Sequence, residues 1–95
     1  MTKEFQLNAK FLADVINSDV TSVENSCKDI NQFTLNIALV NSSSHGKFEM
    51  SCFLVKGGAD VNYDNCLAYR LCLKNFGKDY NLVKYLETAI KLSKL

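Results

Sequence analysis

Residues 47–62, Lys-Phe-Glu-Met-Ser-Cys-Phe-Leu-Val-Lys-Gly-Gly-Ala-Asp-Val-Asn, decide the fold of this chain. An amphipathic helix occupies the first part of the stretch, and Gly57-Gly58 predicts its end, because glycine takes a positive φ at no steric cost. A tight turn follows, and its Asp60-Val61-Asn62 repeats the earlier Asp29-Ile30-Asn31. A recurrence after roughly 30 residues is typical of stacked helical hairpins, which bind other macromolecules more often than they catalyse reactions.

The length and composition predict one ordinary globular domain, residues 1–95. Apolar residues make up 47% of the chain and charged residues 22%, a mixture typical of globular proteins. There is no proline and there are only four glycines, which argues against disorder and against a β-sandwich with many turns. The net charge of +1 provides no general attraction to nucleic acid.

The hydropathy and the cysteines predict a cytoplasmic protein. No segment reaches the ~18 consecutive apolar residues that a membrane span requires. The first residues lack the apolar core of a secretory signal. The four cysteines lie in or beside apolar helical patterns, where a free thiol behaves as a small buried hydrophobe. Two disulfides are the alternative, which the missing secretion signal disfavours.

The spacing of apolar residues predicts a chain of helices. The predicted helices cover residues 8–16, 20–27, 34–41, 47–56, 65–75 and 80–93. The predicted caps are Ser18 or Asp19, Asp64 or Asn65, and Asp79. Residues 33–40 also alternate like a strand, but their apolar run continues through Val40, which favours a helix. Residues 41–46 are rich in serine and are predicted to form a loop.

Parts of this pattern resemble ankyrin repeats. Residues 48–54 resemble the second helix of a repeat, and residues 56–62 carry the Gly-Ala-Asp-Val-Asn ending that is typical of the family. Residues 80–86 follow the register of residues 48–54, whereas the Thr-Pro-Leu-His opening of the family survives only in part at residues 34–38. The resemblance implies an all-α fold, a short solenoid of three stacked helix-turn-helix hairpins. The implied units cover about residues 5–31, 32–62 and 63–95.

The residues that could carry chemistry form no recognisable constellation. His45 is the only histidine, and it lies in the serine-rich loop, with Cys52 as the nearest thiol along the sequence. Cys66 and Cys72 lack the Cys-x-x-Cys spacing of a zinc site. Gly57-Gly58 lacks the Lys-Ser/Thr that completes a phosphate-binding loop. We therefore expect no enzyme activity, no metal and no cofactor.

The ankyrin resemblance implies that the turn tips and inner helices bind a partner protein. The candidate partner-binding residues are Gln32, Phe33, Asn36, Tyr63, Asn65, Arg70 and Lys74. Tyrosine and arginine are enriched where binding energy concentrates, and Arg70 is the only arginine. The predicted function is a non-catalytic protein–protein interaction module. Its most concrete form is a small inhibitor that binds and blocks a toxin or enzyme, as an immunity protein or antitoxin does.

Three alternatives accompany this prediction. The chain could be a viral or pathogen protein that binds a host protein, or a fragment of a longer ankyrin array. It could also bind nucleic acid weakly through its basic C-terminal hairpin, where residues 70–95 carry more lysine and arginine than Asp79 and Glu87 balance. A solvated helix face explains the same charges without any ligand, so nucleic acid is the less favoured partner.

Overall fold

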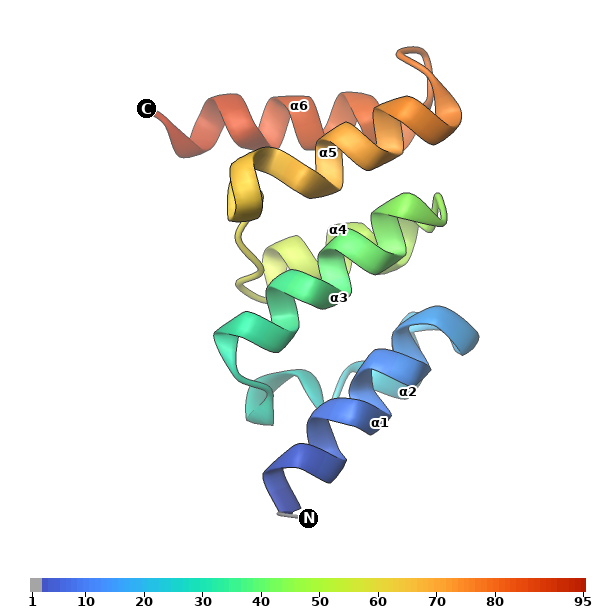
Figure 1. Ribbon diagram of the computed structural model, residues 1–95, viewed down its shortest axis with the longest axis vertical. Helices are drawn as coiled ribbons and strands as arrows, with labels where there is room; N and C mark the ends of the chain where they lie inside the picture. The colour runs from blue at the N-terminus through green and yellow to red at the C-terminus, as the bar shows by residue number, and fades with distance from the viewer. Residues whose placement is uncertain (1–2) are drawn as a thin grey trace.

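The computed structural model describes residues 3–95, apart from the side chains of residues 4 and 5, and all of its regular secondary structure is helical (Figure 1). The helices are α1 (Lys3–Asn17), α2 (Val20–Val23), α3 (Gln32–Ser44), α4 (Phe48–Lys56), α5 (Tyr63–Phe76) and α6 (Asn81–Ser93). A 3-10 turn, η1 (Cys27–Asp29), lies between α2 and α3. No strand occurs within residues 3–95, so the prediction of an all-α fold is confirmed and the strand alternative for residues 33–40 is wrong.

The helices pack in successive pairs along the long axis of the molecule. Figure 1 shows α1 with α2 at one end, α3 with α4 in the middle, and α5 with α6 at the other end. Contacts also run along two rows, one from α1 through α3 to α5, and the other from α2 through α4 to α6. The buried apolar side chains of these rows form one cluster. Because α3 touches α1, α4 and α5, it is the centre of the core.

The glycine stop after α4 forms as predicted. Gly57 keeps a helical φ of −81°, and Gly58 takes the positive φ, +110°. The N–H of Ala59 donates to the Leu54 carbonyl at 2.9 Å, and that of Gly58 donates to the Val55 carbonyl at 3.1 Å. This pair of bonds is the Schellman arrangement, which satisfies carbonyls that the helix end leaves free.

The two Asp-x-Asn turns bury their middle residues equally, but their asparagine side chains make different hydrogen bonds. Ile30 and Val61 are each 7% exposed and belong to the same core cluster. Asn31 caps α3, because its side chain accepts a hydrogen bond from the Thr34 N–H at 2.8 Å. Asn62 makes no such cap, and its amide donates instead to the Ser93 hydroxyl at 2.9 Å.

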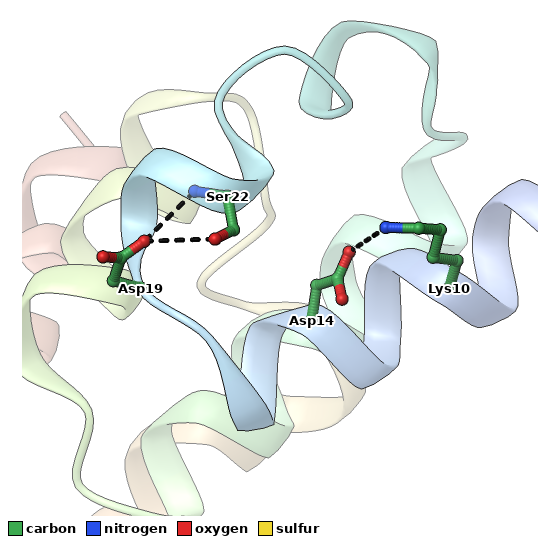
Figure 2. Close-up of polar contacts among 4 residues, drawn as sticks. All are labelled: Lys10, Asp14, Asp19 and Ser22. Atoms are coloured by element: carbon green, nitrogen blue, oxygen red, sulfur yellow. Dashed lines mark hydrogen bonds and ion pairs between the residues drawn. The ribbon is translucent and has the colours of Figure 1, made fainter.

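Two helix boundaries differ from the prediction near the N-terminal end. Helix α1 begins at Lys3, well before residue 8. Helix α2 ends at Val23, and turns with η1 replace the rest of the predicted helix 20–27. The predicted cap at Asp19 is correct: its carboxylate accepts hydrogen bonds from the N–H and the hydroxyl of Ser22, both at 3.2 Å (Figure 2). In α1 the Lys10 ammonium pairs with the Asp14 carboxylate one turn later, at 2.7 Å (Figure 2).

Helix α3 extends to Ser44, so residues 41–44 of the segment 41–46 that was predicted to be a loop are helical, and only residues 45–46 form a turn. Ser42, Ser43 and Ser51 are fully buried where α3 meets α4. The hydroxyl oxygens of Ser42 and Ser51 are 2.7 Å apart, and those of Ser43 and Ser51 are 3.3 Å apart, so the three hydroxyls share hydrogen bonds. Buried hydroxyls with such partners are compatible with a helix–helix contact. The loop prediction failed because the partner residue, Ser51, belongs to the next helix.

Candidate interaction surface

The predicted surface contains a polar cluster that joins α3 to the turn after α4. The Asn36 side chain is buried, and its Oδ1 accepts hydrogen bonds from the Gln32 amide and from the Asp60 N–H, both at 2.8 Å. Gln32 Nε2 also donates to the Gly58 carbonyl at 2.8 Å. These amides therefore stabilise the turn, and Asn36 is not accessible to a partner. Gln32 remains exposed beside it.

Phe33 and Tyr63 form an aromatic pair between α3 and α5. Their ring centroids are 6.1 Å apart, with an interplanar angle of 79°. Tyr63 is half-buried, whereas Phe33 is 63% exposed. An edge-to-face contact of this kind contributes about 0.5–1.5 kcal/mol beyond simple burial. The pair therefore presents a large apolar side chain to solvent in a defined orientation.

The beginning of α5 is a left-handed turn. Asp64, Asn65 and Cys66 have φ values of 51°, 57° and 60°. A left-handed helical conformation costs roughly 1–2 kcal/mol per residue, with Asp and Asn the most tolerant of the residues that have a side chain. Neither Asp64 nor Asn65 is the N-cap of α5, a position that Asn62 holds without a side-chain hydrogen bond, so the predicted cap is wrong.

Arg70 contacts the strained turn directly. Its Nε donates to the Asn65 carbonyl, and its Nη2 donates to the Asp64 carbonyl, both at 2.9 Å. Hydrogen bonds from a charged donor contribute about 1.5–3 kcal/mol each when they are shielded, and less at an exposed residue such as Arg70. The guanidinium therefore offsets part of the backbone strain. Lys74 lies one turn further along α5 and is exposed.

The structure thus divides the seven predicted residues into groups. Gln32 and Asn36 belong to the polar cluster between α3 and the turn after α4, and Phe33 with Tyr63 form the aromatic pair between α3 and α5. Asn65 lies in the left-handed turn, Arg70 donates to its carbonyl, and Lys74 is exposed one turn further along α5. Asp60, which the prediction omitted, joins the polar cluster through its backbone N–H, which donates to Asn36 Oδ1. The sequence did signal Asp60, because it belongs to the repeated Asp-x-Asn motif.

The structure also has a groove on α4 that the sequence analysis did not predict. It has a volume of about 530 Å³ and is lined by Val20, Phe48, Glu49, Cys52, Phe53, Lys56 and Tyr85. A neighbouring hollow of about 310 Å³ shares Val20, Phe48 and Glu49 with it. Phe48 and Tyr85 meet edge to face, with centroids 6.0 Å apart. Apolar periodicity did not reveal the groove, because periodicity alone does not show how far the four-residue α2 covers α4.

Burial raises the pKa of three of the four thiols. All four cysteines are free, and burial raises the pKa of Cys72 to about 11. Burial also raises the pKa of Cys27 and of Cys52. Since the thiolate is the reactive form, a raised pKa lowers reactivity at neutral pH. The ring nitrogen Nδ1 of His45 donates to the Asn41 carbonyl at 2.8 Å, at the end of α3.

These thiols provide a test with alkylating reagents. At pH ~8, roughly one Cys72 thiol in a thousand would be ionised, because its pKa lies about three units higher. We expect iodoacetamide to modify Cys72 far more slowly than the half-buried Cys66 in the native chain, as measured by peptide mass spectrometry. In denaturant, both thiols should react at similar rates. Rapid labelling of Cys72 in the native chain would contradict its burial.

Comparisons with known proteins add no family assignment. Searches against protein-family models, curated proteins and solved structures found no match to this chain. Among the side chains that the structure describes, no three His, Cys, Asp or Glu residues gather in a way that could hold a metal ion. Every helix of residues 3–95 is too short or too polar to cross a bilayer. The geometry of the described residues is therefore the basis for a functional proposal.

Proposed function

We propose that this chain is a non-catalytic protein–protein interaction module built as an ankyrin-like stack of three helical hairpins. The two rows of helix contacts support the stack, because each row links successive pairs in chain order. The equal burial of Ile30 and Val61 supports equivalent roles for the two Asp-x-Asn turns. In such a stack each hairpin buries its apolar side against its neighbours, which leaves the turn tips and one row of helices free to bind.

The exposed Phe33 ring is the observation that carries the proposal. Aromatic side chains are enriched in the buried centres of protein interfaces, where a few residues supply most of the binding energy. The contact with Tyr63 holds the Phe33 side chain in place. Less rotamer freedom is then lost when a partner covers the ring, which lowers the cost of association.

The most concrete form of the function is an inhibitor that covers part of its partner. The molecule measures 40 × 27 × 20 Å along its principal axes. Its broad side therefore has room for the ~800 Å² per partner that a standard interface buries. A small rigid chain that docks in this way acts by excluding other ligands from the surface it occupies.

The proposal is tested with Phe33→Ala. The tagged chain first isolates its partner from cells of the native organism, and the partner is then identified and purified. In calorimetry, we expect Phe33→Ala to weaken the complex about 10-fold or more, since truncating a central aromatic commonly costs that much. An activity assay of the purified partner, with and without the chain, tests the inhibitor role.

Leu92→Ala is the matched control for this experiment. Leu92 is 61% exposed, close to the 63% of Phe33, but it lies on α6. Leu92→Ala should keep the melting temperature of the original chain, whereas Phe33→Ala should lower the free energy of unfolding by about 0.5–1.5 kcal/mol through the lost contact with Tyr63. If Phe33→Ala binds as tightly as the original chain, or if Leu92→Ala weakens binding equally, the Phe33 surface is not the interface.

A further inference from the structure

Arg70 was predicted to touch the partner, but its contacts point to a different role. Both of its hydrogen bonds go to carbonyls of the chain itself, those of Asp64 and Asn65. The two nitrogens, Nε and Nη2, are the adjacent donors of one planar guanidinium, a geometry that a lysine ammonium does not reproduce. The guanidinium can therefore make both bonds only while the carbonyls of Asp64 and Asn65 point toward it, as they do in this turn.

The turn that Arg70 holds begins immediately after Tyr63. The N–H of Tyr63 donates to the Asp60 carbonyl at 3.1 Å, and that of Cys66 donates to the Asn62 carbonyl at 3.2 Å. The three left-handed residues between Tyr63 and the right-handed part of α5 set the direction in which the helix leaves the turn. A change in this backbone would move Tyr63 relative to Phe33 on α3.

Backbone strain of this kind persists only where neighbouring contacts enforce it. Glycine adopts left-handed conformations freely, yet non-glycine residues occupy all three positions here. Asp64 and Asn65 are exposed, so burial of their side chains does not hold the turn. The Cys66 N–H and thiol bond back to Asn62, and the Arg70 bonds are the contacts that the carbonyls of Asp64 and Asn65 themselves make with a side chain.

We propose that Arg70 is a positioning residue, which keeps residues 64–66 left-handed and thereby holds Tyr63 against Phe33. Only the expectation that Arg70 supports partner binding rests on the proposed interaction function. The geometric claim concerns the free chain, so it can be tested without a partner. Failure of that test would leave the Phe33 experiment untouched, and failure of the Phe33 experiment would leave the role of Arg70 intact.

The experiment compares Arg70→Ala, Arg70→Lys and Arg70→Ala with Asn65→Gly, using NMR on the full chain. We expect Arg70→Ala to lower the exchange protection of the Cys66 amide about 10-fold and to change the couplings that report φ at residues 64–66. The Tyr63 ring protons should lose the shift that the Phe33 ring induces. Arg70→Lys should behave like Arg70→Ala, because an ammonium lacks the paired donors.

Asn65→Gly is the rescue that separates positioning from direct contact. Glycine removes the steric cost of a positive φ, so the double variant should regain the Tyr63 shift and most of the Cys66 protection. Lys74→Ala is the matched control, since it removes an exposed cation of α5 and should change neither signal. With a purified partner, the same rescue should restore affinity that Arg70→Ala loses.

Two results would overturn the assignment. In the first, Arg70→Ala leaves the Cys66 protection and the Tyr63 shift as they are in the original chain. In the second, Arg70→Ala abolishes both signals but the glycine substitution does not bring either of them back. The first result would mean that the turn does not depend on Arg70, and the second would mean that Arg70 affects Tyr63 in some way other than by holding residues 64–66 at a positive φ.

Discussion

Replacement of Leu39 by alanine is expected to lower the free energy of unfolding by about 2–5 kcal/mol, the usual cost of truncating a buried leucine. Leu39 is 1% exposed and lies on α3, the helix that touches α1, α4 and α5. A cavity at this position removes contacts from the middle of the core. Because small domains are stable by only about 5–15 kcal/mol, a large share of the total would be lost.

Urea denaturation followed by circular dichroism measures this effect. Leu92→Ala is the control, because it deletes the same atoms from a side chain that is 61% exposed, and surface changes of this kind shift stability by about 0.5 kcal/mol or less. The Leu39 variant should unfold in a single transition at a much lower urea concentration. Equal midpoints for the two variants would show that Leu39 is not at the centre of the core.

Replacement of Gly46 by alanine is expected to cost about 2–4 kcal/mol, for two separate reasons. Gly46 has a φ of +72°, which a residue with a Cβ adopts only at a cost. A Cβ at this position would also lie 2.6 Å from Cζ of Phe76, well inside van der Waals contact. The Phe76 ring is stacked on Tyr80, with centroids 4.7 Å apart, and Tyr80 donates its hydroxyl proton to the Gly46 carbonyl at 2.7 Å.

A double-mutant cycle separates the two costs. In a Phe76→Ala background the clash disappears, so Gly46→Ala should cost only about 1–2 kcal/mol for the positive φ. Gly58→Ala is a second control, because Gly58 has a φ of +110° but nothing lies within 4 Å of its added Cβ. If Gly46→Ala lowers the free energy of unfolding by the same amount with and without the Phe76 ring, the ring does not lie as close to Gly46 as the structure shows.

The polar contacts that sequence reasoning missed come from residues far apart in the chain. Asp79 was predicted to cap α6, but Tyr80 is the N-cap and makes no side-chain capping bond. The Tyr80 hydroxyl instead bonds to a carbonyl that lies 34 positions earlier in the chain. Likewise, the Ser42 hydroxyl meets Ser51 of the next helix. Periodicity and capping rules report on neighbours within a turn or two, so they contain no information on such pairs.

Contacts between distant segments also explain why sequence reasoning described the candidate surface only in part. The ankyrin resemblance drew attention to Phe33 and Tyr63, which meet between α3 and α5. The sequence did not reveal that Asn36 is buried, because its partners, Gln32 and the Asp60 N–H, come from two segments. Nor did it reveal the left-handed turn, because Asp64 and Asn65 are equally suited to capping a helix.

By itself, the sequence determined that the chain is helical and where its firmest boundaries lie. The glycine stop after α4 and the cap at Asp19 depend on backbone geometry and on hydrogen bonds within a few residues, which local sequence specifies. The tertiary structure alone decided that serines 42–44 continue α3, that Phe33 stays exposed beside Tyr63, and that Arg70 turns back on its own chain. Those outcomes depend on which surfaces meet when the helices pack, and packing brings together side chains that no short stretch of sequence contains.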